Sequence, residues 1–198
     1  MTTTTSVPLG TRDRLVRTAS RLMQHGGYES TPVKQLAKEA EATLGSLYHF
    51  FPGGKQELAV AAIGHGDQEF AGMLAAGLAS RTDPAEAVEA VAVMLAEALR
   101  DSDWRDGCPV TATALESVGR MPELQAACAE AFANWRRLVE EKLVASGLAE
   151  EESRDLALTV INTLEGAETA AQVDRSQTPL LTAGRHLARL LRSYAGTR

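Results

Sequence analysis

Apolar residues recur every three or four positions along almost the whole chain, and the strict alternation typical of strands is absent. In residues 11–25, for example, Leu15, Ala19 and Met23 share one face of a helix. The pattern therefore predicts an all-α fold of about nine helices. They are expected at residues 11–25, 32–41, 44–51, 55–80, 84–100, 110–118, 122–145, 150–173 and 179–194.

Caps and breakers divide the first sixty residues into three short helices. Gly26 and Gly27 can end the first helix, because glycine accepts the left-handed conformation. Thr31 offers an N-cap hydroxyl before Pro32, and Thr43 is placed to cap the third helix. Two short helices joined by a tight turn form a helix-turn-helix, whose second helix enters the major groove of DNA.

The third helix should be held by packing, because it is too short to be stable alone. Leu47, Phe50 and Phe51 are expected to point inward, and Pro52 ends the helix. The other face, which carries one aliphatic residue beside polar and aromatic ones, is expected to lie outside, toward a duplex. Its residues are Leu44, Ser46, Tyr48 and His49.

The net charge of −6 conceals an asymmetry between the two parts of the chain. Residues 1–60 carry seven basic and five acidic side chains, a balance of +2, whereas the rest carries 13 basic and 21 acidic ones, a balance of −8. On the first helix, Arg14, Arg17 and Arg21 lie on one face. A mildly basic head on an acidic body is compatible with nucleic-acid binding, although an ordinary solvated surface gives the same totals.

Other classes of function receive little support from the residues. The "PGGK" at 52–55 lacks the first glycine of a phosphate loop, the four histidines are scattered, and no metal-ligand spacing is present, so an enzyme, a cofactor or a metal site is not expected. Two cysteines, no signal peptide and no apolar run long enough for a membrane predict a cytoplasmic protein without membrane contact.

The stretch from Thr31 to Leu58, with "GSLYHFFPGGK" at its centre, closely resembles the tetracycline-repressor (TetR) family of transcriptional regulators. The segment "DGCPVTATALE" from Asp106 to Glu116 is similar to the LmrA/YxaF-type branch of that family. The resemblance implies a disordered tail at 1–10, a DNA-binding domain at 11–54 and a ligand-binding and dimerisation domain at 55–198. It also implies a homodimeric repressor that leaves its inverted-repeat operator when a small-molecule inducer binds.

The resemblance also implies roles for single residues of the head. Thr43, Tyr48 and His49 match positions that bond the phosphate backbone, and Lys55 matches a basic residue with the same role, whereas Gly45 and Ser46 lie near the bases. Leu44 and Glu41 depart from the family pattern, and Glu41 would strain the turn if its φ were positive. The complete set expected at DNA is Thr31, Val33, Thr43, Leu44, Gly45, Ser46, Tyr48, His49 and Lys55.

For the body, large apolar side chains and a few polar ones are candidates for a ligand pocket between helices, although each also suits the core. They are Trp104, Phe132, Trp135, Asn162 and Glu165. Two apolar stripes on the last two helices are candidates for a four-helix interface in the homodimer, and the alternative is that they face the body's own core. They comprise Leu156, Val160, Leu164, Ala167, Leu187 and Leu191.

Two further functions stay open from the sequence alone. Oxidation or alkylation of Cys108 could release the DNA in place of reversible ligand binding, whereas the ordinary interpretation is a small, partly buried residue before Pro109. A helical interaction module without sequence-specific DNA binding is the other alternative, and it would lack a steep dependence of affinity on salt.

Overall fold

The computed structural model describes residues 9–195, and within that range the chain forms nine helices and no strand. The predicted all-α class is therefore confirmed for the described residues. The expected disordered tail at 1–10 falls on residues of which 1–8 lie outside the described part. The helices are α1 (Thr11–Gly26), α2 (Val33–Glu39), α3 (Leu44–Phe50), α4 (Gly54–Ala79), α5 (Pro84–Asp101), α6 (Pro109–Ser117), α7 (Pro122–Ala145), α8 (Glu150–Asp174) and α9 (Thr178–Ala195).

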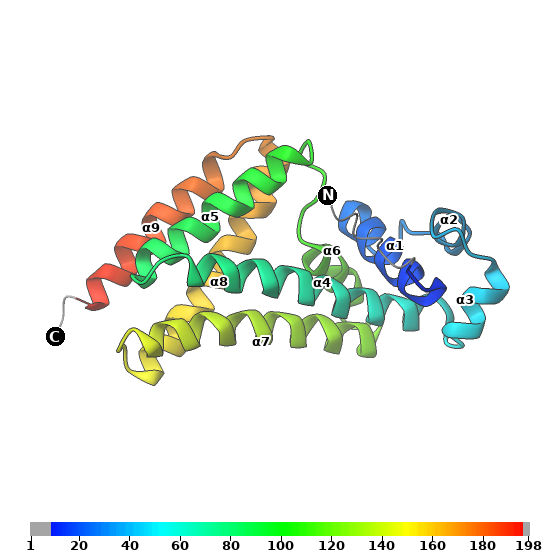
Figure 1. Cartoon of the computed structure of the whole chain (residues 1–198), viewed down its shortest axis with the longest axis horizontal. Coiled ribbons are helices and arrows are strands. Elements are labelled where there is room, and N and C mark those ends of the chain that lie inside the picture. The colour runs from blue at the N-terminus through cyan, green and yellow to red at the C-terminus, as the bar shows by residue number, and fades with distance from the viewer. Residues whose placement is uncertain (1–8, 196–198) are drawn as a thin grey trace, which may run out of the picture.

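The molecule is elongated, with a small head of α1, α2 and α3 at one end (Figure 1). Helix α4 runs from the head into the body, and its 26 residues span about 39 Å at 1.5 Å per residue. Helix α7 lies along α4, α5 packs against α9, and α8 crosses behind them. Helix α6 contacts both α1 and α4, so it lies where the head meets the body.

Proline marks the beginning of three helices in the body. Asp83 accepts hydrogen bonds from the backbone N–H groups of Ala85 and Glu86 and so caps α5 just before Pro84. Helix α7 begins at Pro122 as expected, since proline at the first helical position lacks only an N–H that has no intrahelical partner. The boundaries of the body helices lie within a residue or two of their predicted positions.

Two glycines of α4 allow close approach by other helices. A Cβ atom on Gly66 would lie 2.9 Å from Cγ of Pro109, and one on Gly77 would lie 2.6 Å from Cγ2 of Val91. Because real Cβ atoms do not approach so closely, α6 and α5 can pack at these points only against glycine. None of the helices in the described range is long and apolar enough to cross a bilayer.

The apolar stripes of α8 and α9 face inward, which corrects the expectation that they form a surface for a second subunit. Their side chains belong to the core of the single chain, where they pack mainly among α5, α7, α8 and α9. The buried members are Leu156, Val160, Leu164, Leu187 and Leu191, and Ala167 is partly buried against them.

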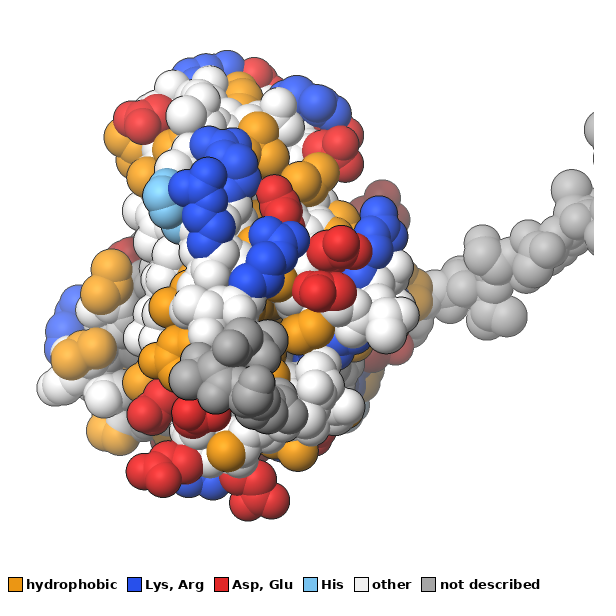
Figure 2. All heavy atoms as spheres, turned by 90° about the vertical axis from the view of Figure 1, so that its left-hand side faces the viewer, with side chains coloured by type: hydrophobic (Ala, Val, Ile, Leu, Met, Phe, Trp, Pro, Cys, Tyr) orange, Lys and Arg blue, Asp and Glu red, His pale blue; other side chains and the backbone are white. Residues whose placement is uncertain are grey.

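The outward faces of α8 and α9 differ in charge. Arg185, Arg189 and Arg192 are exposed on α9, whereas Glu151 and Asp155 are exposed near the beginning of α8. Figure 2 looks onto this end of the body: most of the basic side chains lie in its upper half with acidic ones among them, and further acidic ones lie along its lower edge. A single chain therefore exposes basic residues on α9 and acidic residues near the beginning of α8.

Candidate functional site

Helix α3 is fixed to the head by two side chains of its inner face. Leu47 and Phe51 are almost completely buried and belong to the core. Phe50, which was expected to point inward with them, is exposed, because it lies one position before Phe51 and therefore about 100° away around the helix axis. The side chain of Thr43 accepts a hydrogen bond from the backbone N–H of Ser46, which confirms Thr43 as the N-cap.

The turn between α2 and α3 is a Schellman motif with a non-glycine residue in the left-handed position. Glu41 has φ of 50°, so the strain expected from its departure from the family pattern is present. The guanidinium of Arg14 donates to the carbonyl oxygens of Ala40 and Glu41 at 3.0 and 3.2 Å. The turn is thereby tied directly to α1.

The outer face of α3 is accessible from solvent. Tyr48 is 52% exposed and Leu44 is 40% exposed, and His49 and Gly45 are exposed beside them. Ser46 is partly exposed, and its hydroxyl shares a hydrogen bond of 2.9 Å with that of Thr43. Hydroxyl, phenol and imidazole groups at one short helix are suitable partners for phosphate oxygens.

Three other residues expected at DNA lie in different surroundings. The ammonium of Lys55 lies 4.1 Å from the centroid of the Tyr28 ring, and its pKa is lowered by burial, so it must rotate away from the ring to reach a phosphate. Thr31 is buried and its hydroxyl donates to the carbonyl of Gly27, so it is not the N-cap expected for α2 and offers no side chain to DNA. Val33 is partly exposed on the first turn of α2.

Two of the three arginines expected on the basic face of α1 are engaged in contacts within the head. Arg14 binds the turn described above, and Arg21 forms an ion pair of 2.6 Å with Glu39 on α2. Arg17, the third member of this set, is exposed on the surface. The positive charge available to DNA on this face is therefore smaller than the sequence suggests.

Helix α6 connects the head to the body through one carboxylate. Glu116 accepts hydrogen bonds from the backbone N–H groups of Tyr28 and Glu29 at 2.6 and 3.0 Å. A Cβ atom at Gly27 would lie 2.6 Å from Oε1 of Glu116, so this approach requires glycine, which also has φ of 78°. The turn that follows α1 is thus held by the C-terminal part of α6.

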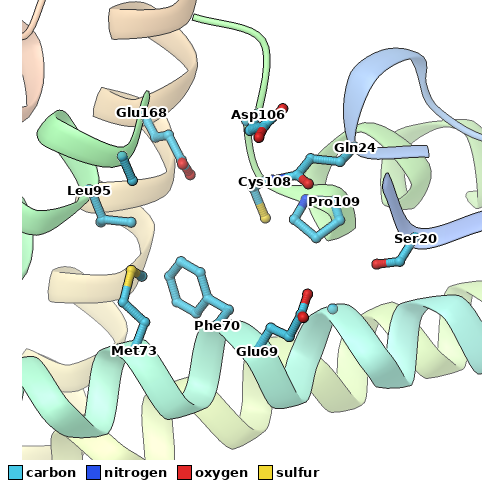
Figure 3. Close-up of a pocket in the computed structure, with 13 residues that line it drawn as sticks. Ser20, Gln24, Glu69, Phe70, Met73, Leu95, Asp106, Cys108, Pro109 and Glu168 are labelled. Carbon is cyan, nitrogen blue, oxygen red and sulfur yellow. The ribbon is translucent and has the colours of Figure 1, made fainter. Parts of the chain in front are cut away.

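A cavity of about 180 Å³ lies at the other end of α6, between α1, α4, α5 and α8 (Figure 3). Phe70, Met73 and Leu95 form an apolar wall, and Glu168 and the thiol of Cys108 point toward the same space. Ser20 and Gln24 of α1 complete the lining on the side of the head. A molecule in this cavity would contact the head and the body at once.

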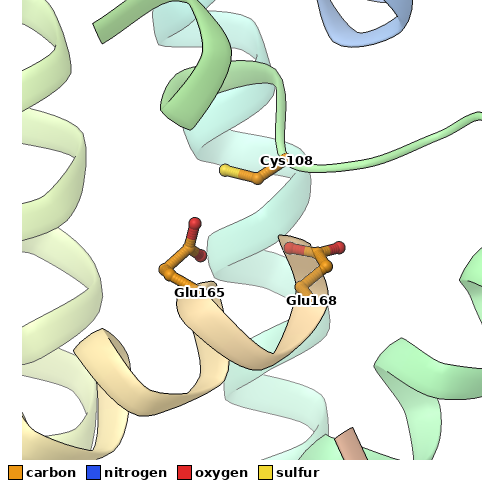
Figure 4. Close-up of side chains that lie close together, drawn as sticks. All are labelled: Cys108, Glu165 and Glu168. Atoms are coloured by element: carbon orange, nitrogen blue, oxygen red, sulfur yellow. The ribbon is translucent and has the colours of Figure 1, made fainter. Parts of the chain in front are cut away.

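Beside the cavity, Cys108, Glu165 and Glu168 form a buried acidic cluster (Figure 4). Their nearest potential ligand atoms all lie within 4.8 Å of one another, and this is the only group of three such ligands that the described residues contain. Thr111 donates to Glu165 at 2.6 Å, whereas Oε2 of Glu168 is buried without a hydrogen-bond partner. Burial, with a smaller contribution from Glu165, raises the pKa of Glu168 to about 8.

The expected ligand residues are not the ones that line this cavity. Trp135 is fully buried behind Phe70, with its Nε1 donating to Asp67, and Phe132 packs on its edge. Asn162 is exposed on the outer face of α8, which contradicts its assignment to an internal pocket. Trp104 lies partly buried in the loop after α5, and Glu165 belongs to the acidic cluster.

Glu168, the most unusual group at the cavity, is not among the residues predicted from the sequence. One signal was present, because position 168 falls on the same buried stripe of α8 as Leu164 and Ala171. A charged residue on an apolar stripe is a candidate for a functional group, since unpaired charges are rarely buried. Ser20 and Pro109 gave no comparable signal.

The surroundings of Cys108 do not favour a thiol sensor. Burial first, and then the charges of Glu165 and Glu168, raise the pKa of the Cys108 thiol well above its ordinary value. Because the thiolate is the reactive form, these surroundings suppress reaction with oxidants and electrophiles.

Comparisons with known proteins agree with this arrangement. Residues 15–62 match the family model described as "Bacterial regulatory proteins, tetR family", and residues 84–186 match that of the "Transcriptional regulator LmrA/YxaF-like, C-terminal domain". The chain belongs to the TetR family. The two matched regions coincide with the head plus the start of α4, and with most of the body.

Relatives within the TetR family span nearly the whole chain. The HTH-type transcriptional regulator YxaF of Bacillus subtilis is 32% identical over 91% of this chain and 95% of its own length. The regulator LmrA of the same organism is 33% identical over 86% and 90%, respectively. The crystal structure of a regulatory protein TetR from Rhodobacter sphaeroides superimposes with a TM-score of 0.80 at 25% identity, covering 90% of this chain and 97% of that one. This TetR-family chain is thus a transcriptional regulator with the helical fold of its relatives.

Proposed function

We propose that this regulator is a homodimeric repressor that binds an inverted-repeat operator in the cytoplasm and is released by a small molecule. The observation that supports it most directly is the accessible outer face of α3, presented by the buried anchors Leu47 and Phe51. Residues 11–54 would form the DNA-binding domain and residues 55–198 the domain for ligand and dimer. No catalytic role is proposed for any residue.

On the operator, Thr43, Tyr48 and His49 would bond phosphates, and Lys55 would join them after leaving the ring of Tyr28. Gly45, with Leu44 and Ser46 beside it, would lie against base edges, where Leu44 can meet a thymine methyl group. Phosphate contacts fix the position of the head, and base contacts select the sequence.

The dimer would use the outward faces of α8 and α9 in place of their buried stripes. The basic residues Arg185 and Arg189 and the acidic residues Glu151 and Asp155 are exposed on these faces, so two copies related by a two-fold axis can pair opposite charges. Light scattering at micromolar concentration is expected to find a dimer. A monomer at that concentration would contradict this part of the proposal.

A displacement caused by a ligand in the cavity would reach the head through α6 and α4 and lead to release of DNA. Cys108 and Pro109 at the beginning of α6 line the cavity, and Glu116 near its end holds the turn after α1. A ligand that fits better when α6 is displaced would favour a state with differently placed heads, because only a difference in affinity can shift the equilibrium.

The DNA-binding proposal is tested by gel-shift titrations at two salt concentrations, on duplex fragments selected by the purified protein. Tyr48→Ala and Lys55→Ala should both weaken binding to all fragments, and Lys55→Ala should also lower the dependence of log affinity on log salt by about one unit, because only the lysine carries a charge. Lys142→Ala is the matched control, since its ammonium binds the carbonyl of Arg81 in the body. If the wild-type affinity were independent of salt, or Lys142→Ala acted like Lys55→Ala, the proposal would be wrong.

A further inference from the structure

The charges around the cavity between α1, α4, α5 and α8 are of one sign. Its thirteen lining residues include Glu69, Asp106 and Glu168 but no lysine, arginine or histidine. Two of these carboxylates are paired with histidines outside the lining: Asp106 with His25 at 2.6 Å and Glu69 with His65 at 3.4 Å. Glu168 is the carboxylate left for a ligand.

Glu168 is 6% exposed, and its Oε2 has no hydrogen-bond partner among the described residues. Its side chain points into the cavity beside Leu95, with Met73 and Phe70 of α4 across the space (Figure 3). A buried polar atom without a partner costs free energy, so a site that keeps one is expected to gain its partner on binding.

The size of the cavity limits the ligand. A dry cavity of about 150 Å³ holds one benzene molecule, and this cavity of about 180 Å³ is slightly larger. The apolar wall is suited to a ring or a short branched chain, and the carboxylate is suited to a cationic group at one end of it.

We propose that this cavity binds a small organic cation, with an ammonium group at Glu168 and an apolar body against Phe70, Met73 and Leu95. The assignment rests on the ligand-responsive function proposed above and names the chemical class of its ligand. Since Ser20 and Gln24 belong to α1, such a ligand would also contact the head that must move.

Binding should release protons, because the site holds them in the absence of a cation. The titratable groups that face Glu168 are Cys108 and Asp106 from the loop before α6, Glu69 of α4 and Glu165 of its own helix; α5 contributes Leu95 and Ala98. With the pKa of Glu168 raised to about 8 by burial, its carboxyl is mostly protonated at pH 7. A cation would replace that proton, with release of about one proton per ligand.

The test uses the full chain without DNA in isothermal titration calorimetry. The probes are 2-phenylethylammonium chloride and the uncharged 2-phenylethanol, which have the same ring and chain, and zinc chloride as a metal. Buffers of different ionisation enthalpy report the protons released. The expected result is binding of the ammonium at least about tenfold tighter than the alcohol, because an ionised partner strengthens a hydrogen bond.

Glu168→Gln should lower the affinity for the ammonium at least about tenfold and abolish proton release. Its affinity for the alcohol should change by less than about twofold. Glu152→Gln is the control for net charge, because it lies exposed on the first turn of α8, about 24 Å along the helix from Glu168. Ala98→Trp provides a second variant that should fold, since Ala98 is exposed at the rim, and it should block both organic probes.

Equal affinity for the ammonium and the alcohol, an unchanged affinity in Glu168→Gln, or no binding of either probe would overturn the assignment. So would zinc binding that is lost in Cys108→Ala and Glu165→Gln while the ammonium fails to bind, because the acidic cluster would then be a metal site. Gel shifts on the same preparations separate the two proposals. A protein that binds DNA but not the ammonium refutes only the ligand class, and one that binds the ammonium but no DNA refutes the proposed repressor.

Discussion

Glu116 accepts a hydrogen bond of 2.6 Å from the backbone N–H of Tyr28, a residue 88 positions earlier in the chain. The same carboxylate accepts a second bond from the N–H of Glu29. A single side chain of α6 therefore satisfies two N–H groups in the turn that leads from α1 to α2.

Removal of this carboxylate should loosen the junction between head and body. Glu116→Ala is expected to lower the free energy of unfolding by about 1–2 kcal/mol, since two charge-assisted hydrogen bonds are lost at a partly exposed site. Hydrogen exchange measured by NMR should become faster at the amides of Tyr28 and Glu29. Glu130→Ala, an exposed change on α7, is the control, and equal protection of the two amides in both variants would contradict the role of Glu116.

The turn between α2 and α3 should be improved by glycine. Glu41 has φ of 50°, a conformation that costs an ordinary residue roughly 1 kcal/mol and glycine nothing. Glu41→Gly is expected to raise the free energy of unfolding by about 0.5–1 kcal/mol, seen as a higher midpoint of urea unfolding. Arg14 binds the backbone carbonyl of Glu41, which glycine keeps. Glu39→Gly, at the last residue of α2, should have the opposite effect, because it places glycine in a helix and removes the ion pair with Arg21. A loss of stability in Glu41→Gly as well would show that Glu41 is not strained.

Gly45 offers a way to separate sequence preference from folding. A Cβ atom there would meet only Oγ1 of Thr43 at 3.6 Å, an ordinary contact, so Gly45→Ala should fold and be up to about 1 kcal/mol more stable. If α3 lies in the major groove, the added methyl group will change which duplexes are selected, as measured by sequencing bound fragments. Unchanged selection together with full DNA affinity would place Gly45 away from the bases.

The stability of the protein should depend on pH through Glu168. Its pKa is raised from 4.5 to about 8, so the folded state holds the proton more tightly than the unfolded chain does. The resulting stabilisation is complete below pH 4.5 and is lost as the pH rises to 8. Glu168→Gln should therefore match the wild type near pH 5 and exceed its free energy of unfolding by about 2–4 kcal/mol at pH 8.

Urea titrations at several pH values measure this difference. Glu152→Gln, with the same change in net charge, should follow the wild type throughout. A constant offset of Glu168→Gln across the range would mean that the carboxyl titrates normally in the folded state.

Local signals in the sequence were sufficient for the helices and for the outer face of α3. Pro84 and Pro122 mark helix beginnings through their own covalent geometry, and Thr43 caps α3 through a hydroxyl three residues from its partner. Such effects act within one turn of helix, so the order of residues is enough to predict them. The family resemblance then connected this local pattern with DNA.

Relations between distant segments could not be obtained in this way. The stripe of Leu156 and Val160 has the same period whether it meets its own core or a second subunit, and only the packing of α5 and α9 shows that it is filled. The cavity could not be predicted from the sequence either, because its lining residues Ser20, Cys108 and Glu168 come from segments far apart in the chain. The charge of Glu168 was a local signal, but its missing partner is a property of the assembled fold.

Arg14 connects α1 directly to the turn between α2 and α3. Since its guanidinium holds the carbonyls of Ala40 and Glu41, the angle between α1 and α3 is set by covalent lengths and hydrogen bonds rather than by a flexible loop. A tilt of α1 is therefore expected to move the outer face of α3 with it. If a ligand in the body acts on the head as proposed, we expect the head to turn as one unit at the end of α4, with its three helices intact.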